Sequence, residues 1–593
     1  MLRPYRGSGD MSERAVSILA GSSRNLPHAR AHELFEEQAR MRPEAIAAVH
    51  GSTQLTYAEL NARANQVARA LLARGLTREG VVGVVTERSL DWMTAVLAIF
   101  KAGGAYLPIE PQFPPERIAK TLARAGALLV LTEELIEAMY REGHAEDNLG
   151  IEVSPEQLAY IYFTSGSTGE PKGAMCEHAG LLNHLFAKID DLKITAGTAV
   201  AQTAPQGFDI SLWQLMAALL VGGRVVIVEQ ETILDARRFI GKIVNTRVNI
   251  VQLVPSYLEV LVSYLAQHPS ELPDVEYVVA TGEALKKELV ERWFAVQPGI
   301  KLVNAYGLTE TSDDTNHEIM DRPPSGERVS LGRPINNVHI YVVDEQLQPV
   351  PTGEPGEIVF SGICVGRGYI NDPERTRRAF LQDPLCPGQR LYRSGDYGRA
   401  LPDGKLEFLG RRDSQVKLHG FRIEIGEVEN ALLRVGGVRD GAVVVNTHLV
   451  AFYRAARPLD SARMRETLAQ SLPAYMVPSA FHWRETWPLT ENGKIDRKAL
   501  AALAGDLDGA EQNHEGLATA TEQWLAAAWA DVLGIPKEQI GRRDRFFDLG
   551  GTSLSALKLV IALDRAVSFK DLTAHPALAD QAALIDQRGV RSA

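Results

Sequence analysis

Cysteine is scarce in this chain, and its scarcity limits the possible chemistry. Only Cys176, Cys364 and Cys386 occur, far apart and without a CxxC pair. This pattern suggests neither a disulfide framework nor a zinc site, and it fits a reducing compartment. Long apolar runs are also lacking: none approaches the ~20 residues of a membrane span, and the stretch MLRPYRGSGDMSERA holds no apolar core of signal-peptide length. We therefore expect a cytoplasmic protein with no membrane partner.

A surplus of basic residues is missing as well. Lys and Arg total 63 against 74 Asp and Glu, which gives a net charge of −11. A mildly acidic chain of this kind is not expected to bind nucleic acid or membrane surfaces. The 593 residues are 45% hydrophobic and 23% charged, as in ordinary globular proteins. A chain of this length should divide into three or four compact units.

Short β-branched runs alternate with helical patterns up to about residue 410. Runs that we interpret as buried strands lie at 81–85, 127–132, 224–229, 249–254 and 277–281. Between the early runs, one helical pattern places an apolar stripe on a single face, made of Leu60, Ala64, Val67, Ala68, Leu71 and Leu72. The alternation predicts an α/β fold with layered, mostly parallel sheets.

Composition divides the chain into segments. Residues 1–20 are polar and are predicted to be a flexible N-terminus. The large α/β core is predicted to span residues 21–410, and a smaller α+β unit residues 411–504. Residues 505–516, GDLDGAEQNHEG, lack periodicity and apolar side chains, so we interpret them as a linker.

The last segment, residues 517–590, has a helical pattern. Thr519 and Glu522 have the spacing of a capping box. An apolar stripe follows at Leu525, Trp529, Val532 and Leu533. We predict a small all-α domain on a tether.

The stretch TSGSTGEPKG, from Thr164 to Gly173, is the first candidate binding site. It does not fit the Walker pattern GxxxxGK[ST]. Its glycines would nevertheless let backbone N–H groups approach an anion closely, and its hydroxyls and Lys172 would add donors and charge. A flexible surface hairpin without a ligand is the alternative.

This loop and the motifs around it resemble amino-acid adenylation domains of nonribosomal peptide synthetases, which are adenylate-forming enzymes. The resemblance covers nearly the whole chain, with the motifs in order. They are LTYAEL (55–60), FKAGGAYLPIEP (100–111), NAYGLTE (304–310), GEIVFSGICVGRGY (356–369), YRSGD (392–396), GRRDSQVKLHGFRIEIGEVE (410–429), LPAYMVP (472–478) and NGKIDRKAL (492–500). The resemblance implies a large adenylate-forming core, a small mobile lid subdomain and, beyond them, an all-α four-helix carrier domain.

The reaction implied by the resemblance has two steps. A carboxylate attacks the α-phosphate of ATP and releases pyrophosphate, and a thiol then displaces AMP to form a thioester. Because negative charge gathers at phosphorus, the first step needs cations and fixed donors. The resemblance assigns the pyrophosphate end of ATP to Thr164, Ser165, Gly166, Ser167, Thr168, Gly169 and Lys172.

The resemblance also assigns the rest of the nucleotide site. Asn304, Ala305, Tyr306 and Gly307 are expected to bind ATP, with the Tyr306 ring on the adenine. Thr309 is expected to touch the α-phosphate, and Glu310 to coordinate Mg²⁺, a hard cation that prefers oxygen ligands. Asp396 is expected to accept hydrogen bonds from the ribose, with Arg411 nearby. Read singly, Tyr306 could be a core residue, Asp396 a turn residue and Glu310 a surface acid.

Lys494 follows an Asn-Gly pair, which is a strong tight-turn signal. Alone, it would be read as a solvated charge on a loop tip. The resemblance makes it the catalytic lysine that reaches from the lid to bridge the carboxylate and the α-phosphate. The lid must then move for the second step. Asp413 resembles the family's hinge, and the segment near Lys417 and Gly420 would line the path of the thiol.

The stretch DRFFDLGGTSLSALKLV (544–560) resembles a carrier-protein motif. In that motif Ser553 bears a 4′-phosphopantetheine arm, which a phosphopantetheinyl transferase attaches. The alternative is a glycine stop followed by a helix N-cap. After the motif, the last helical patterns begin several residues sooner than in most carrier domains. This puts the third carrier helix and its partner-facing loop in doubt. A carrier on a tether implies that the enzyme loads itself.

The resemblance places Asp209 where it would pair with the substrate α-ammonium, a charge-assisted contact that selects amino acids. Asp209 could also be an ordinary N-cap. The rest of the pocket set is Ile210, Trp213, Gln252, Val279, Thr281, Ala305, Asp313, Asp314 and Lys494. If Asp313 and Asp314 face the pocket, two buried carboxylates need a cation or donors. A basic or guanidine-bearing substrate is the first expectation, and a glutamine-like one is the second.

No HHxxxDG condensation motif and no GxSxG thioesterase motif occurs in the sequence. We therefore expect the thioester to pass in trans to a condensation domain or a tailoring enzyme, in natural-product biosynthesis. An MbtH-like accessory protein is left open as a partner. Two alternatives compete: an acyl- or aryl-CoA ligase of the same fold, and an inactive carrier scaffold. Asp209 and the carrier motif argue against the first, and intact Lys494, Glu310 and Asp396 argue against the second.

Overall fold

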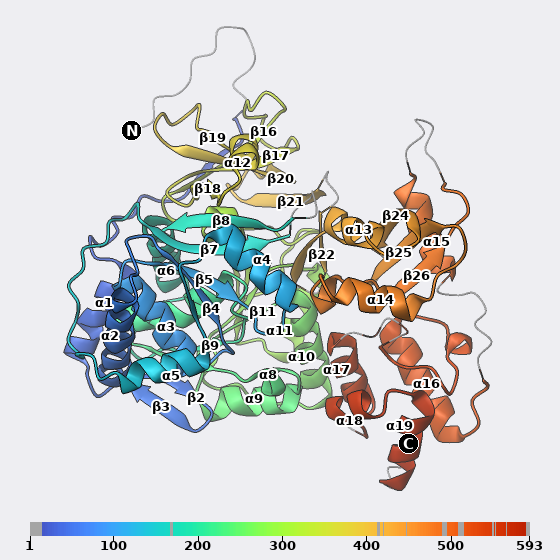
Figure 1. Ribbon diagram of the computed structural model, residues 1–593. Helices are drawn as coiled ribbons and strands as arrows, with labels where there is room; N and C mark the ends of the chain where they lie inside the picture. Colours follow the sequence, from blue (N-terminus) through green and yellow to red (C-terminus); the bar gives the residue numbers. More distant parts are fainter. Residues whose placement is uncertain are drawn as a thin grey trace.

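The computed structural model describes residues 15–165, 170–411, 415–418, 420–445, 448–488, 495–507, 515–547, 549, 551, 553–564 and 566–588, with the backbone alone at 505–507, 553 and 554. A large body holds two big sheets, and a third sheet lies at one end of it (Figure 1). A small lid subdomain and a helical domain follow along one side. None of the described helices is both long enough and apolar enough to cross a membrane.

The largest sheet has nine strands in the order β15-β14-β13-β12-β11-β9-β10-β2-β3. Its strands are β2 (Ile46–His50), β3 (Thr53–Thr56), β9 (Ala199–Gln202), β10 (Arg224–Ile227), β11 (Ile250–Leu253), β12 (Tyr277–Ala280), β13 (Lys301–Leu308), β14 (Asp313–Met320) and β15 (Arg333–Pro334). From β13 to β2 the neighbouring strands are parallel, and the pairs at both edges are antiparallel.

The second sheet has the order β18-β8-β7-β5-β4-β6. Its strands are β4 (Val81–Val85), β5 (Ala105–Ile109), β6 (Leu129–Leu131), β7 (Leu158–Thr164), β8 (Lys172–Glu177) and β18 (Gly368–Tyr369). The four strands from β7 to β6 are parallel. All five apolar runs that were expected to be strands are strands in these two sheets, so the predicted α/β fold with mostly parallel sheets is confirmed.

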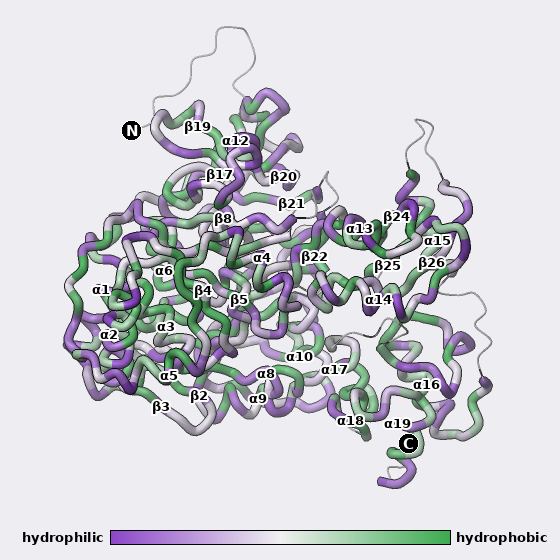
Figure 2. Tube along the Cα trace, in the orientation of Figure 1, coloured by the Kyte–Doolittle hydropathy of each residue, from purple (hydrophilic) through white to green (hydrophobic). Residues whose placement is uncertain are grey.

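Helices cover the two sheets. Their apolar side chains pack against the strands and form much of the described apolar core. They are α1 (Ala31–Met41), α2 (Tyr57–Ala73), α3 (Leu90–Lys101), α4 (Pro115–Ala125), α5 (Glu133–Arg141), α6 (His178–Asp191), α7 (Ile210–Met216), α8 (Gln230–Ile233), α9 (Ala236–Asn245), α10 (Pro255–Gln267), α11 (Lys287–Val296) and α12 (Pro373–Ala379), with 3₁₀ turns at Ala218–Val221 and Thr309–Thr311. The expected stripe on α2 is buried, except that Leu72 is only partly covered. Figure 2 shows that hydrophobic segments such as β4 and α6 lie inside, among more polar surface segments.

The third sheet is antiparallel, which the alternating pattern did not predict. It contains β1 (Ile18–Ala20), β16 (Val338–Val343), β17 (Gly356–Gly362), β19 (Phe380–Gln382), β20 (Arg390–Ala400) and β21 (Leu406–Arg411). Because β1 pairs with β16, residues 18–20 do not belong to a flexible N-terminus, and that boundary is corrected. Three paired residues are too short a signal to identify a strand from the sequence.

The lid subdomain is α+β, as expected. It has a hairpin of β22 (Gln415–Leu418) and β23 (Phe421–Glu424) and a sheet of β24 (Val438–Val445), β25 (Leu449–Ala455) and β26 (Ala480–Trp483). Its helices are α13 (Ile425–Leu433), α14 (Ser461–Ala469) and α15 (Arg497–Leu507), with a 3₁₀ turn at Ala474–Met476. Since α15 continues to Leu507, the helix enters the segment predicted as linker, and the linker boundary is corrected.

The C-terminal domain is helical, with α16 (Ala520–Leu533), α17 (Ser553–Ala562), α18 (Phe569–Ala574), α19 (Leu578–Gln587) and a 3₁₀ turn at Lys537–Gln539. The capping box of Thr519 and Glu522 is confirmed, and Leu525 and Trp529 are buried in the domain core. The third helix, which the sequence left in doubt, is the short α18, capped by Ser568.

The helical domain contacts the large body through α17, which lies on α10 (Figure 1). Leu557 and Ile561 of α17 join the apolar cluster of the large body and are almost fully buried. Beside them, Lys558 Nζ lies 2.7 Å from Glu259 Oε2 of α10. This contact brings the start of α17 to the side of the body that carries the candidate site.

Candidate active site

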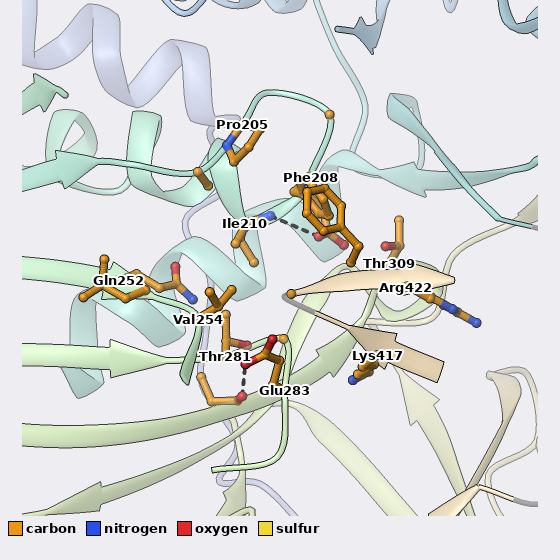
Figure 3. A pocket seen from close by; sticks show the side chains of 18 of the residues that line it. Pro205, Phe208, Ile210, Gln252, Val254, Thr281, Glu283, Thr309, Lys417 and Arg422 are labelled. Carbon is orange, nitrogen blue, oxygen red and sulfur yellow. Dashed lines mark hydrogen bonds between the residues drawn. The ribbon is translucent and has the colours of Figure 1, made fainter. Parts of the chain in front are cut away.

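A cavity of about 1030 Å³ opens where the carboxyl ends of the parallel strands meet the lid hairpin (Figure 3). This edge of an open α/β sheet is where ligands usually bind. The cavity draws on the ends of β7, β11, β12 and β13, the start of α7, the first turn of α10 and the β22–β23 hairpin. Its lining includes Thr164, Ser165, Asp209, Ile210, Gln252, Thr281, Asn304, Ala305, Tyr306, Gly307, Thr309, Asp313, Asp314, Lys417 and Arg422.

Thr164 and Ser165, at the end of β7 where the glycine-rich stretch begins, line this cavity. Gly166, Ser167, Thr168 and Gly169 lie outside the described residues. Of its neighbours, Ser165 Oγ donates to the backbone carbonyl of Arg422 at 2.7 Å and accepts from the Glu424 N–H at 3.1 Å. The serine therefore ties the loop to the lid hairpin. Thr164 Oγ1 is buried and has no hydrogen-bond partner in the described part of the chain.

Glu310 is fully buried at the centre of a cationic cluster. Its Oε1 lies 3.1 Å from Lys172 Nζ and accepts from the Tyr369 hydroxyl at 2.8 Å, and its Oε2 lies 2.9 Å from Arg422 Nη1. Burial acts to raise the pKa of Glu310, but Arg422 and Lys172 outweigh it and hold that pKa well below its ordinary value. The side chain is therefore an anion throughout the physiological range.

Both oxygens of Glu310 thus already have protein partners. Mg²⁺ takes oxygen ligands. With Lys172 at one oxygen and Arg422 at the other, the Glu310 carboxylate is already occupied by protein cations in this arrangement and does not fit the metal. The coordination of Mg²⁺ by Glu310 stays a prediction.

Tyr306 lines the cavity, and Asp396 and Arg411 lie beside it. Tyr306 donates from its hydroxyl to Asp396 Oδ2 at 2.5 Å, and Arg411 binds the other carboxylate oxygen. Burial, together with Asp396, raises the pKa of Tyr306 well above its ordinary value, so the hydroxyl keeps its proton. The three expected adenosine residues are therefore brought together, and their contacts with adenine and ribose stay predictions.

The strand that carries Tyr306 leaves no room for a side chain at Gly307. A Cβ there would lie 1.9 Å from the Asp313 carbonyl oxygen, because β13 and β14 shift register at this point. The neighbouring Asn304 is buried and donates to the Ser330 carbonyl at 2.8 Å. These residues shape the cavity wall, and nucleotide binding by them is not tested.

Asp209 has the N-cap role that the sequence offered as one reading, and its pairing with a substrate α-ammonium stays a prediction. It caps α7, accepting from the Ile210 N–H at 3.0 Å, and it also lines the cavity. Burial raises the pKa of its carboxyl to about 6, with a hydrogen bond from Thr309 opposing the shift. A buried carboxylate with so few partners is suited to pair with an ammonium group.

Two members of the expected pocket set lie behind the cavity wall. Trp213 and Val279 are fully buried, and neither is among the lining residues described. Trp213 acts through its indole N–H, which donates to Gln252 Oε1 at 2.5 Å. Ile210, Gln252, Thr281, Ala305, Asp313 and Asp314 do line the cavity.

The two adjacent acids are buried, but Asp314 already has a counter-ion. Lys188 of α6 lies with its Nζ 2.6 Å from Asp314 Oδ2, and neither side chain is exposed. A basic substrate was expected because both carboxylates would need the ligand to compensate their charge. That premise is corrected, because the protein compensates Asp314 itself. The only sequence signal was a lysine on an otherwise apolar helix, which sequence reasoning missed.

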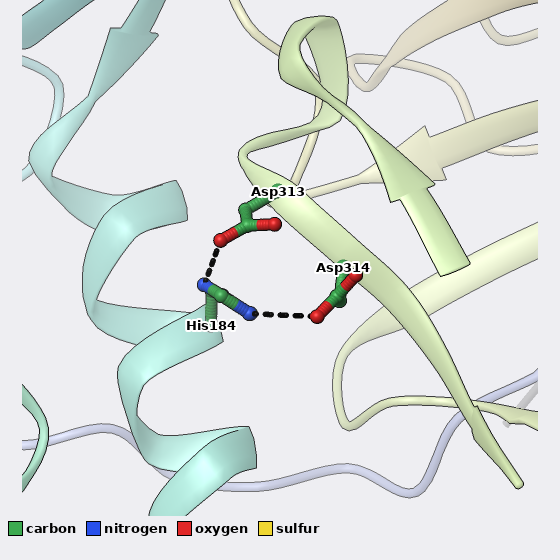
Figure 4. Close-up of side chains that lie close together, drawn as sticks. All are labelled: His184, Asp313 and Asp314. Atoms are coloured by element: carbon green, nitrogen blue, oxygen red, sulfur yellow. Dashed lines mark ion pairs between the residues drawn. The ribbon is translucent and has the colours of Figure 1, made fainter. Parts of the chain in front are cut away.

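His184, also on α6, lies between the two acids (Figure 4). Its Nδ1 is 3.5 Å from Asp313 Oδ2, and its Nε2 is 3.9 Å from Asp314 Oδ2. The three side chains are close enough to hold a metal ion. However, burial and the Lys188 charge lower the pKa of His184, and Lys188 already supplies a cation at Asp314. The group is therefore better described as the polar floor of the pocket.

The lid contributes its β22–β23 hairpin to the cavity. Lys417 lies 5.6 Å from the centre of the Tyr306 ring. Gly420, at the hairpin turn, has φ +81°, and a Cβ there would lie 2.5 Å from Val254 Cγ1. The expected hinge Asp413 and the expected catalytic Lys494 lie outside the described residues. Ser553 is the first residue of α17, and its side chain is not described.

Family comparisons agree with this arrangement. The AMP-binding enzyme family matches residues 35–370, the AMP-binding enzyme C-terminal domain matches residues 427–494, and the phosphopantetheine attachment site matches residues 523–585. The three matches follow the order of the core, the lid and the helical domain.

Relatives carry the same three parts. The chain is 37% identical to tyrocidine synthase 1 of Brevibacillus parabrevis, over 93% of this chain and 52% of that protein, and 36% identical to gramicidin S synthase 1 of Brevibacillus brevis, over 92% and 51%. It thus spans about half the length of these two synthetases.

A solved structure is similar along nearly its full length. Holo-PA1221, described as a nonribosomal peptide synthetase protein containing adenylation and PCP domains bound to a vinylsulfonamide inhibitor, superposes with a TM-score of 0.81 at 26% identity, over 94% of this chain and 97% of that one. The chain therefore belongs to the AMP-binding enzyme family, as a nonribosomal peptide synthetase adenylation domain followed by a phosphopantetheine carrier domain.

Proposed function

We propose that this protein activates an amino acid with ATP and loads it onto its own carrier domain. One observation carries the proposal: α17, which begins at Ser553, is seated on α10, and the first turn of α10 lines the same cavity as Asp209. An activating site and the attachment point for a thiol arm thus lie on one face of the molecule. The tether makes the second step intramolecular and raises the effective concentration of the thiol.

In the first half-reaction, a carboxylate oxygen of the amino acid forms a bond to the α-phosphorus of ATP while the bond to pyrophosphate breaks. Asp209 is placed to pair with the α-ammonium and so to orient the carboxylate. Lys172 and, by resemblance, the glycine-rich loop would offset charge on the phosphates. The role of Lys494 in bridging the carboxylate and the α-phosphate remains the resemblance-based part of this proposal, with Asp413 as the hinge.

In the second half-reaction, the sulfur of the phosphopantetheine arm attacks the carbonyl carbon and the bond to AMP breaks. The thiol proton leaves to AMP or to water. The hairpin position supports this step, because Lys417 and Gly420 line the cavity, Gly420 lies against Val254 just before α10, and Arg422 lies beside Glu310.

The arm must first be attached by a phosphopantetheinyl transferase. The loaded amino acid then passes in trans to a condensation domain or a tailoring enzyme of natural-product biosynthesis, and an MbtH-like protein is a candidate accessory partner. A basic or guanidine-bearing substrate would need Asp313 to lose its proton and act as the counter-ion, against the raised pKa of that carboxyl. A polar uncharged substrate is the competing class, and the Lys188–Asp314 pair favours it.

The test is ATP–pyrophosphate exchange across amino, fatty and aryl acids, followed by intact mass of the full chain after treatment with a phosphopantetheinyl transferase. We expect exchange with an amino acid, and a mass gain of one aminoacyl group that Ser553→Ala abolishes. Exchange with only fatty or aryl acids would show a ligase of the other class. No exchange with any acid, by a chain that still accepts the arm, would show a carrier scaffold.

A further inference from the structure

The charge of Asp314 at the floor of the substrate pocket is compensated by residues of the protein itself. Lys188 Nζ lies 2.6 Å from Asp314 Oδ2, and the Thr281 hydroxyl lies 3.2 Å from Asp314 Oδ1. The same ammonium lies 4.9 Å from the centre of the Trp213 ring. Although burial acts to raise it, Lys188, followed by His184 and His317, holds the pKa of Asp314 below its ordinary value. The pair is thus an ion pair with no net charge.

Asp313 lines the cavity beside Asp314, but no lysine or arginine pairs with it among the described residues. Its Oδ2 lies 3.5 Å from His184 Nδ1 and has no hydrogen-bond partner in the part of the chain that the structure describes. Burial, then the charges of Asp314 and Asp209, raise the pKa of Asp313 well above its ordinary value. A neutral carboxyl can both donate and accept a hydrogen bond. The His184 ring beside it is neutral as well.

Gln252 presents a donor to the same space. Its Oε1 accepts from the Trp213 indole at 2.5 Å and from Gln214 Nε2 at 3.2 Å. Because an indole N–H can only donate, the amide orientation is determined, and Nε2 must face the cavity (Figure 3). That nitrogen is buried and unpartnered among the described side chains.

A ligand that satisfies this floor must accept from Gln252 and also exchange a hydrogen bond with Asp313. Ammonium and guanidinium groups carry donors only, so they leave the Gln252 N–H facing another N–H. They would also be desolvated near the Lys188 ammonium. Carboxamide, ureido and imidazole groups carry both an acceptor and a donor.

We infer that the pocket selects an amino acid whose side chain ends in a neutral group that both accepts and donates hydrogen bonds, and that Lys188 is a specificity-determining residue that excludes cationic side chains. This inference rests on the proposed function. It adds to the pocket set a residue that lies behind the wall and reaches the substrate through Asp314.

Exchange assays on the full chain test the inference directly. In the wild type, glutamine, citrulline or histidine should give a kcat/KM about tenfold or more above lysine, ornithine and arginine, because a site built from buried hydrogen-bonding groups rejects ligands that leave them unpaired. Preference for a cationic or a wholly apolar side chain overturns the inference but leaves amino-acid activation standing. Exchange with no amino acid contradicts the proposed function instead.

Two variants separate charge from packing. Lys188→Met keeps the side-chain length and frees the charge of Asp314, so the ratio of cationic to neutral substrates should rise about tenfold. Lys188→Met with Asp314→Asn removes the charge again and should return the ratio to that of the wild type. An unchanged ratio in a folded Lys188→Met protein, checked by thermal melting, overturns the assignment.

Gln252→Glu tests the substrate preference of the pocket without changing Lys188. Its Oε1 can still accept from Trp213, while the group facing the cavity changes from a donor to a carboxylate oxygen. The variant should gain activity with lysine or arginine and lose it with glutamine. If it keeps the wild-type order of substrates, the role of Gln252 Nε2 is wrong.

Discussion

Arg422 of the lid and Glu310 of the core form a buried ion pair across the cavity, with Arg422 Nη1 2.9 Å from Glu310 Oε2. The lid hairpin therefore supplies one of the two cations that compensate Glu310, and Lys172 of the core supplies the other. If the lid moves between the two half-reactions, as the family resemblance implies, the Arg422–Glu310 pair exists only in the arrangement with the hairpin inserted.

Replacing Arg422 by Ala should affect the two half-reactions unequally. Breaking a buried pair costs about 3–5 kcal/mol, and this cost falls on the hairpin-in arrangement alone. Thioester loading should slow by about a hundredfold, while ATP–pyrophosphate exchange changes much less. Single-turnover loading of a labelled amino acid, measured beside exchange, checks this.

Arg434→Ala is the matched control for Arg422→Ala. Arg434 also joins the lid to the core, but its guanidinium is more than half exposed and lies 3.7 Å from Glu170. Exposed pairs of this kind contribute little, so both half-reactions should be unchanged. Equal losses of exchange and loading in Arg422→Ala would contradict the proposal that Arg422 acts mainly in thioester loading.

A second ion pair holds the lid in the same orientation. Arg117 Nη1 of α4 lies 2.8 Å from Glu427 Oε1 of α13, with side-chain exposures of 11% and 3%. Arg117→Glu sets two carboxylates against each other and should slow loading by about tenfold or more. The swapped variant, Arg117→Glu with Glu427→Arg, should recover much of that loss. Loading assays on the three proteins test the coupling.

Lys120→Glu, one turn away on α4, is the control for that swap. Lys120 pairs with Glu116 and is 55% exposed, so its reversal should change loading little. The pair is unimportant for lid position if Arg117→Glu loads like Lys120→Glu, or if the swap recovers nothing.

Asp209 predicts a pH dependence with a definite sign. The raised pKa of about 6 means that the carboxyl takes up a proton as the pH falls through 6. Only the anion pairs with the α-ammonium, so kcat/KM for the amino acid should fall about tenfold per pH unit below 6, since this parameter reports the free enzyme. Exchange rates measured from pH 5 to 8 check this.

Asp209→Asn isolates the charge from the helix cap. The amide oxygen can still accept from the Ile210 N–H, so α7 should keep its cap, while the charge-assisted contact is lost. A loss of about 1.5–3 kcal/mol corresponds to roughly ten- to hundredfold in kcat/KM. The variant should show no fall near pH 6. A wild-type profile that is flat between pH 5 and 7 would contradict the assignment.

Regular elements of the fold could be predicted because their signals are local. The run at 81–85 became β4 with the same bounds, and Thr519 capped its helix as its spacing indicated. The third sheet could not be predicted, because its strands come from residues 18 to 411 and pair antiparallel across distant loops. Pairing between such distant segments leaves no periodic trace in either one.

The candidate site follows the same division. Asp209, Gln252 and Tyr306 could be placed from their motifs, and each lines the cavity. Lys188 could not, because its position opposite Asp314 depends on how α6 packs against β14. A buried charged residue cannot be recognised from the sequence until its partner is known. The expected substrate class changed for this reason, while the expected reaction stayed the same.

Docking of the carrier gives the last prediction. Leu557 and Ile561 pack into the cluster of the large body rather than the carrier's own core. Leu557→Asp should therefore leave the carrier folded but place an unpaired charge against α10. Loading should fall by about tenfold or more, given that a buried leucine contributes about 1.5–3 kcal/mol, while exchange is unaffected.

Two controls make the docking result interpretable. Treatment of the variant with a phosphopantetheinyl transferase should still add the arm, which reports a folded carrier. Lys558→Ala removes the pair with Glu259, in which the side chains are 35% and 41% exposed, and should change loading little because such pairs are solvent-screened. If Leu557→Asp accepts the arm and loads at the wild-type rate, the α17–α10 contact is not the one through which the thiol reaches the adenylate. Because the tether would remain intact in that variant, its loading rate separates the contribution of this surface from that of simple proximity.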